Sequence, residues 1–184
     1  MKIETSFIPG ILVISPNVFH DHRGYFFESF NQKEFNEETN LDVNFIQDGE
    51  SYSHKGVIRG IHFQSYPFEQ NKLVRVIEGE VLDVVVDLRR ESDYFGKYFS
   101  RVLSGENKTQ LFIPKGFGHA FLCLSDYAIL AYKVDEIYSS ANDRTILWSD
   151  PNLNIDWKID DSEVKISDKD KNGESFISFV ENYD

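Results

Sequence analysis

The alternation of hydrophobic and polar positions predicts short β-strands along most of the chain. Residues 73–77 alternate between apolar and polar side chains before a turn signal at residues 78–80, and residues 81–88 are rich in β-branched side chains. The same reading predicts further strands at residues 11–14, 25–30, 110–113 and 128–134. A helical pattern is good only over about residues 32–39, and a second short helix is expected near residues 161–166.

Gly, Pro and Asn separate these strands at spacings typical of an all-β sandwich or barrel, about 8–12 residues. The length of 184 residues predicts one domain spanning residues 1–184, with no repeat and no interior linker. No apolar run approaches the length of a membrane-spanning helix, and the first residues lack the pattern of a signal peptide. We therefore expect a cytoplasmic protein without a membrane partner.

The charge balance narrows the possible partners. Nineteen Lys and Arg residues against thirty-one Asp and Glu residues give a formal net charge of −12. From residue 156 onward, nine acidic residues face four basic ones, so nearly half of the excess lies in this segment. Nucleic-acid binding needs a basic surface, so we expect no nucleic-acid partner. The 16 Phe and 9 Tyr residues favour strands and stacking pockets.

Three short segments carry candidate chemistry. In residues 56–64, a bend at Gly60 would bring Arg59 and His62 to one site, although a surface arginine and a core histidine fit equally. Lys72 begins a predicted strand and would point either into a barrel or into solvent. In residues 113–121, a Pro and two Gly residues predict a turn that delivers His119 to the mouth of a cavity. A core histidine is the alternative for His119.

A metal site is not expected from this pattern. Metal-binding cupins carry a His-x-His pair, whereas this chain has His62-Phe63-Gln64, and an amide oxygen is a poor replacement for imidazole. His62, His119 and a carboxylate such as Glu69 would be the only ligands. The single Cys123 excludes an internal disulfide, and its apolar neighbours predict a buried, inert thiol.

Several short motifs follow one another in a fixed order over nearly the whole chain. They are Asp21-His22-Arg23-Gly24, Phe27-Glu28-Ser29, Phe45-Ile46-Gln47-Asp48 with Ser51 and Ser53, Val57 to Gln64, Gln70 to Arg75, Gly79-Glu80-Val81 with Asp83, Val86 to Arg89, Leu103 to Asn107, Ile113 to His119, Tyr132-Lys133, and Trp148 to Pro151 with Ile155-Asp156-Trp157. As an ordered set they resemble the dTDP-4-dehydrorhamnose 3,5-epimerase family.

The resemblance implies a fold and a reaction. The fold is all-β, a cupin-type double-stranded β-helix or jelly roll with a few short helices. The protein would be a homodimer with exchanged N-terminal strands, and would use neither a metal nor another cofactor. The implied reaction inverts C3 and C5 of dTDP-4-keto-6-deoxy-D-glucose, giving dTDP-4-keto-L-rhamnose. The C4 ketone acidifies both carbons, so each inversion needs a base, an acid on the opposite face and a cation for the enolate.

The resemblance also implies catalytic roles, which spacing alone does not assign. His62 matches the proton acceptor of the family, and Asp170 matches the carboxylate that orients its imidazole. Tyr132 matches the proton donor on the opposite face of the sugar. Lys72 matches the cation beside O4, and His119 a polar contact to the sugar.

Binding roles follow in the same way. Arg23 and Arg59 match pyrophosphate contacts, since a planar guanidinium pairs well with phosphate oxygens. Glu28 and Gln47 match nucleoside contacts, with Arg23 and Glu28 coming from the partner subunit. Tyr138 matches the ring that stacks on thymine. Such a site would gather basic groups within an acidic chain. The net negative charge does not exclude an anionic ligand, because affinity depends on the local electric field in the site.

A few positions depart from the family pattern. Gly49 stands where the family commonly has Asn, which removes a side-chain amide from the nucleotide site. Asp143 replaces the usual Glu at a further substrate contact, and Lys169 lies at another. Gly118 and Ala120 exchange small residues on either side of the histidine. These departures leave the implied acid, base and cation in place and bear on the identity of the sugar.

Three alternatives stay open at this point. The chain could be a 3-only or 5-only epimerase of another nucleotide-linked 4-keto-deoxysugar, because the same base and cation serve either carbon. It could be a 3,4-ketoisomerase of similar fold, which would move the carbonyl. It could also be a non-catalytic cupin that binds a sugar nucleotide without turnover. Products observed by NMR would distinguish all three.

Overall fold

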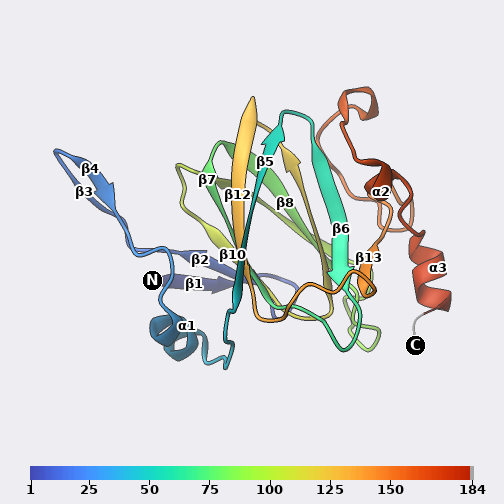
Figure 1. Cartoon of the computed structure of the whole chain (residues 1–184), viewed down its shortest axis with the longest axis horizontal. Coiled ribbons are helices and arrows are strands. Elements are labelled where there is room, and N and C mark those ends of the chain that lie inside the picture. Colours follow the sequence, from blue (N-terminus) through green and yellow to red (C-terminus); the bar gives the residue numbers. More distant parts are fainter. Residues whose placement is uncertain (183–184) are drawn as a thin grey trace.

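The computed structural model describes residues 1–182, and two antiparallel β-sheets dominate it (Figure 1). The first sheet has six strands, in the order β1 (Lys2–Thr5), β2 (Leu12–Ser15), β10 (Gln110–Ile113), β7 (Lys72–Glu78), β12 (Tyr127–Val134) and β5 (Gln47–His54). The second has five strands, in the order β13 (Asp143–Thr145), β6 (Ile58–Gln64), β11 (Phe117–Cys123), β8 (Glu80–Asp87) and β9 (Tyr98–Ser104). This is the jelly roll expected from the sequence.

The inner faces of the two sheets form the main core. Val74 and Leu130 of the six-stranded sheet belong to one buried cluster with Val85 and Phe121 of the five-stranded sheet. Strand β8 is buried along nearly its whole length, because a second cluster covers its other face. The continuous apolar pattern of residues 81–88 reflects this burial on both sides. Cys123 is buried as predicted, and burial raises the pKa of its thiol.

Short helices cover the outer faces of the sheets. Helix α1 (Gln32–Thr39) packs Phe35 against Phe112 of β10, at the bounds that the sequence predicts. The 3₁₀-helix η1 (Asp161–Glu163) precedes α2 (Asp168–Lys171) and α3 (Phe176–Glu181). Figure 1 shows α2 and α3 beside β6 and β13, on the side away from β5. Phe179 of α3 belongs to the buried cluster on this outer face.

The structure corrects several local predictions. The strand predicted at residues 25–30 ends at Phe26, since β4 (Gly24–Phe26) pairs only with β3 (Phe19–Asp21) in a projecting hairpin. The helix predicted at residues 161–166 is a single 3₁₀ turn. The turn expected before His119 is present and His119 lines a cavity, but the residue itself lies inside β11, where it pairs with His62 and Val85 on its two sides. Ladder pairing on both edges keeps His119 in the sheet.

Candidate active site

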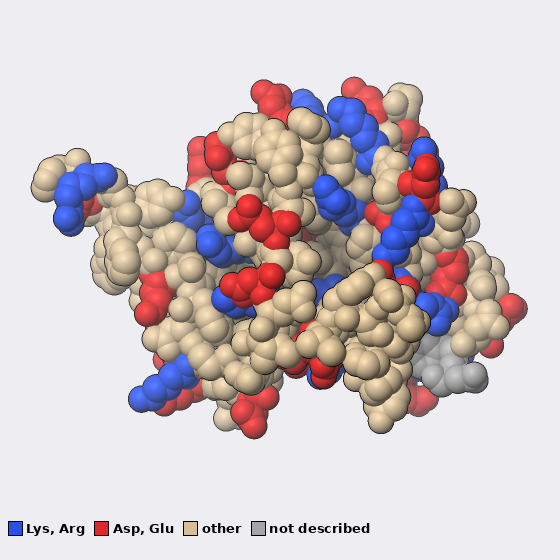
Figure 2. Space-filling view, in the orientation of Figure 1, with Lys and Arg blue, Asp and Glu red and all other residues tan. Residues whose placement is uncertain are grey.

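A cavity of about 370 Å³ opens between the two sheets, and we call it the central cavity. Eight of the residues singled out in the sequence line it: Arg59, His62, Lys72, His119, Tyr132, Tyr138, Asp143 and Lys169. They come from β6, β7, β11, β12, β13, α2 and the loop after β12, so the fold gathers side chains distant in the sequence. The space-filling view shows this face hollowed near its middle, with basic side chains beside the hollow (Figure 2).

His62 and Asp170 form a hydrogen-bonded pair at the wall of the cavity. The Nε2 atom of His62 lies 2.7 Å from a carboxylate oxygen of Asp170, and the Gly60 amide donates to the other oxygen at 3.2 Å. Asp170 lies on α2, whose first turn is capped by Ser167. Burial raises the pKa of Asp170, but the hydrogen bond and charge of His62, the Gly60 amide and the charge of Lys169 together outweigh this and hold that pKa below its usual value. The carboxylate therefore stays ionised and orients the imidazole.

A second imidazole–carboxylate pair lies deeper between the sheets. The Nε2 atom of His119 lies 2.9 and 3.0 Å from the two carboxylate oxygens of Asp83, which is fully buried on β8. Burial raises the pKa of Asp83, against the opposing effect of His119. The sequence assigns Asp83 no role, although an acidic residue within an apolar, β-branched strand is a signal of a buried polar site, one that Asp83 shares with Asp87.

Lys72 is a cation that lines the central cavity. It starts β7 on the six-stranded sheet, and burial lowers the pKa of its ammonium to about 8, although Asp143 and Asp83 oppose this shift. A lysine with this pKa is mostly protonated at neutral pH and weakly solvated. Such a group stabilises negative charge on a bound ligand more strongly than a hydrated surface lysine does.

Tyr132 reaches the cavity from the opposite sheet to His62. It lies on β12, directly across from Gly49 of β5 in the strand register. His62 stands on β6 of the five-stranded sheet, so an imidazole and a phenol line the same cavity from different sheets. A base and a general acid so placed can act on opposite faces of one bound molecule.

The remaining cavity residues form its mouth. Arg59 donates to Ser53 Oγ at 3.0 Å and to the Tyr52 carbonyl at 3.0 Å, which fixes its guanidinium. Tyr138 donates to Asp143 at 2.9 Å, a bond that raises the pKa of its phenol, while its ring stays exposed. Lys169 forms an ion pair with Asp143. Arginine, lysine and an open ring suit a phosphorylated aromatic ligand.

Three predicted binding residues do not line this cavity within one chain. Arg23 sits on the projecting β3–β4 hairpin, where it forms an ion pair with Asp21 at 2.5 Å. Glu28 accepts a hydrogen bond from Asn31 and lines a separate groove. Gln47 is exposed at the start of β5. For Arg23 and Glu28, the sequence reasoning expects a role at the partner subunit's site.

Residues 1–182 contain no cluster of three or more His, Cys, Asp or Glu side chains arranged to hold a metal ion. Within the same residues, no helix has the length and apolar character needed to cross a membrane.

Comparisons with known proteins agree over almost the whole chain. The dTDP-4-dehydrorhamnose 3,5-epimerase family profile matches residues 5–178. The enzyme of that name from Shigella flexneri is 49% identical over 96% of this chain and 97% of its own length. The structure is similar to a Legionella pneumophila dTDP-6-deoxy-D-glucose-3,5-epimerase in complex with dTDP-4-keto-L-rhamnose, at a TM-score of 0.92, with 41% identity and 100% and 94% of the two chains covered.

A Streptomyces bikiniensis 3'-monoepimerase in complex with dTDP-quinovose also matches, with a TM-score of 0.90, 33% identity and 96% and 89% of the two chains covered. The likeness of fold therefore extends to enzymes that act at one carbon. The profile match and the near full-length identity nevertheless decide the family. This chain belongs to the dTDP-4-dehydrorhamnose 3,5-epimerase family.

Proposed function

We propose that the protein is an isomerase that converts dTDP-4-keto-6-deoxy-D-glucose to dTDP-4-keto-L-rhamnose by epimerisation at C3 and C5. The observation that carries this proposal is the central cavity itself. His62, held by Asp170, lines this space from one sheet, and Tyr132 and Lys72 line it from the other. Full-length similarity to enzymes of this name supports the substrate assignment.

The chemistry starts at His62. With one ring nitrogen donating to Asp170, the other ring nitrogen holds the lone pair and removes a proton from the carbon beside the C4 ketone. The electron pair of that C–H bond moves into an enolate whose negative charge rests on O4. Lys72, protonated below a pKa of about 8, stabilises this oxygen.

Inversion is completed from the opposite face. Tyr132 gives its phenolic proton to the carbon, which leaves a phenolate on the enzyme and an imidazolium at His62. Both groups return to their starting states by proton exchange with solvent, and the second carbon then reacts in the same way. The scheme uses only side chains of the protein. We place this enzyme in the cytoplasm, as the sequence suggests.

The active protein is proposed to be a homodimer with exchanged N-terminal strands. The β3–β4 hairpin projects from the body and carries Phe19 and Phe26, both largely exposed in one chain, beside Arg23 (Figure 1). Docked on a second copy, it would bury this apolar surface and supply a guanidinium to the partner's nucleotide. Light scattering should give twice the 21.4 kDa chain mass, and a monomeric active enzyme would contradict the proposal.

The decisive experiment follows solvent deuterium into the sugar. The protein is incubated with dTDP-4-keto-6-deoxyglucose in D₂O, and NMR reports deuterium at C3 and C5 separately. We expect incorporation at both carbons, and none at either in His62→Ala. His54→Ala is the matched control, since His54 is exposed at the end of β5 and outside the cavity lining.

Other outcomes would select the alternatives. Deuterium and inversion at only one carbon would identify a 3-only or 5-only epimerase, as in the Streptomyces bikiniensis relative. A displaced carbonyl would identify a ketoisomerase. Binding of dTDP without any exchange would identify a non-catalytic cupin.

A further inference from the structure

Gln64 is a buried glutamine whose side chain is hydrogen-bonded to the backbone of two loops. It is 6% exposed, lies two residues after His62 on β6 and also lines the central cavity. Its Nε2 atom donates to the Phe68 carbonyl at 2.7 Å and to the Ile137 carbonyl at 3.1 Å. Its Oε1 atom accepts from the Ser139 amide at 2.6 Å. Both hydrogens of the side-chain amide are therefore engaged, so Gln64 links the two loops.

Two of these hydrogen bonds lie on either side of Tyr138 in the sequence. The carbonyl before Tyr138 and the amide after it are held by the one glutamine. In the β6–β13 ladder, Gln64 is paired with Asp143, and Asp143 accepts the hydrogen bond of the Tyr138 hydroxyl at 2.9 Å. Two neighbouring residues of one sheet thus fix both the backbone and the hydroxyl of Tyr138.

The ring itself stays open to a ligand at the mouth of the cavity. Tyr138 is 57% exposed and the preceding Ile137 is 54% exposed, so burial of apolar surface contributes little to holding this segment. The hydrogen bonds of Gln64 and Asp143 take over that task. An aromatic face that is exposed but held in place is suited to stacking on a planar ring.

We infer that Gln64 is a positioning residue that holds Tyr138 ready to stack on the base of the bound nucleotide. This inference rests on the proposed function, in which the ligand is a dTDP sugar. Ordering a loop at the moment of binding costs affinity, and a segment that is fixed beforehand avoids this cost. Metal-binding cupins carry the second histidine of their His-x-His pair at this position. In this protein the same position holds the ring at the cavity mouth.

Binding of dTDP, measured by isothermal titration calorimetry, tests the inference without turnover. Gln64→Met keeps an unbranched side chain of similar length but has no donor. Its Kd for dTDP should rise about 5–10-fold, which is part of the roughly 5–150-fold that stacking of a base contributes. Tyr138→Ala should weaken binding at least as much. Gln64→Met added to Tyr138→Ala should cause no further loss, because no ring is left to position.

Kinetics separate a positioning role from general damage to the site. In Gln64→Met, KM for the keto sugar should rise with the Kd for dTDP, while kcat stays within about threefold of the parent, because the base is bound equally in the ground and transition states. Gln32→Met is the matched control. Gln32 of α1 also donates to a backbone carbonyl, that of Val43, and accepts from a backbone amide, that of Phe45, but lies outside the central cavity.

Several outcomes would overturn the inference. They are an unchanged Kd in Gln64→Met, a further loss of affinity in the Tyr138→Ala background, an equal loss in Gln32→Met, and a fall in kcat without a rise in KM. Failure of the proposed function is a different result. If the parent binds dTDP but does not epimerise the sugar, the proposed reaction is wrong and the binding test of Gln64 still decides. If the parent does not bind dTDP, both are overturned.

Hydrogen exchange in the parent protein keeps the inference testable if Gln64→Met folds poorly. Without nucleotide, NMR should show the Ser139 amide exchanging with D₂O at least about tenfold more slowly than the Tyr138 amide, for which residues 1–182 provide no hydrogen-bond acceptor. Equal exchange of the two amides would show that the bond to Gln64 is not in place before the nucleotide binds, and would overturn the inference.

Discussion

Two carboxylates in this protein are buried to nearly the same degree and have different partners. Asp170 is 3% exposed and Asp87 is 0% exposed. Each has a pKa below its usual value, because hydrogen bonds to its partners outweigh the burial that raises it. The partner of Asp170 is His62, at 2.7 Å, and the partner of Asp87 is Arg89, at 2.6 Å.

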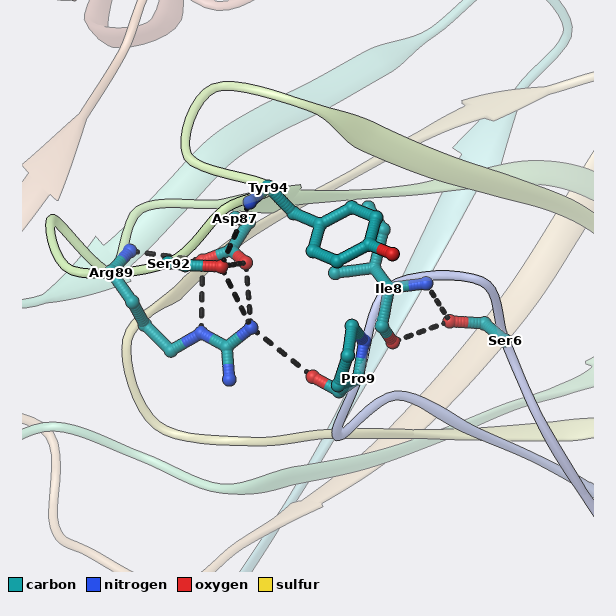
Figure 3. Close-up of polar contacts among 7 residues, drawn as sticks. All are labelled: Ser6, Ile8, Pro9, Asp87, Arg89, Ser92 and Tyr94. Carbon is teal, nitrogen blue, oxygen red and sulfur yellow. Dashed lines mark hydrogen bonds and ion pairs between the residues drawn. The ribbon is translucent and has the colours of Figure 1, made fainter.

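The Asp87 cluster ties loops together (Figure 3). Arg89 reaches Asp87 through two side-chain nitrogens, donates to the Pro9 carbonyl at 3.1 Å, and lies 4.3 Å above the ring of Phe117. Ser92 donates to the same carboxylate at 2.7 Å. The cluster thus holds the N-terminal loop against the end of β8. None of these residues lines the central cavity.

The comparison shows that burial of a carboxylate does not make a catalytic site. An arginine keeps its proton at every relevant pH, so the Asp87–Arg89 pair cannot exchange a proton with a bound molecule. A histidine exchanges its proton near neutral pH, and His62 faces a cavity. Two features therefore distinguish the candidate catalytic pair, His62–Asp170, from the Asp87–Arg89 pair. Its basic partner can lose and regain a proton, and that partner faces the central cavity.

The largest effect is expected from Asp170→Asn. The amide cannot stabilise an imidazolium, so turnover should fall about 100-fold or more, a size typical of general acid–base steps. The rate of deuterium incorporation in D₂O measures this loss. Asp168→Asn is the control on the same helix, where the side chain is exposed. Turnover in Asp170→Asn equal to that of the control would place Asp170 with Asp87 as a structural carboxylate.

A smaller and graded effect is expected from pH. As pH rises through about 8, Lys72 loses its proton and its charge, so kcat should fall toward a tenfold loss per pH unit. Arg keeps its charge, so in Lys72→Arg the residual activity should lack this step. A wild-type profile that stays flat to pH 9.5 would contradict the role of Lys72.

A fall in kcat above pH 8 cannot be explained by unfolding that results from deprotonation of Lys72. Its folded-state pKa of about 8 lies below the unfolded value, near 10.4. Between these two values the unfolded chain binds more protons, so the contribution of Lys72 to stability rises with pH. As pH rises, activity should therefore fall while the contribution of Lys72 to stability increases. Chemical denaturation at each pH would measure that stability beside the activity.

The smallest effect on turnover is expected from Asp87→Ala. It leaves the Arg89 guanidinium without its carboxylate and should lower the free energy of unfolding by about 3 kcal/mol, while kcat of the folded protein stays unchanged. Urea denaturation measures the first quantity. The low pKa of Asp87 stabilises the fold above its unfolded pKa, and this is lost as pH falls through the folded value, so variant and parent should converge in acid. A large fall in kcat of Asp87→Ala would show that Asp87 also supports catalysis and would contradict its assignment as a structural carboxylate.

The ordered motifs predicted most of the cavity lining but not its electrostatics. Eight predicted side chains meet in the central cavity, because motifs in a family mark positions that converge in space. Asp83 was missed, since an acid within an apolar strand does not show which residue of another strand it pairs with, and its partner His119 lies on β11. The strand at residues 25–30 was overextended, since Phe30 packs on Phe35 and leaves the hairpin. The extent of the domain, residues 1–184, stays a prediction.

By itself, the sequence determined the all-β class, α1, the strands with clear alternation and the identity of the family, because periodicity and ordered motifs are local properties of the chain. Only the tertiary structure decided which buried acids face a cavity. It also showed that Gln64, read from the sequence as a missing metal ligand, holds the backbone on both sides of Tyr138. Such facts depend on contacts between segments that are distant in sequence, and no local pattern encodes them.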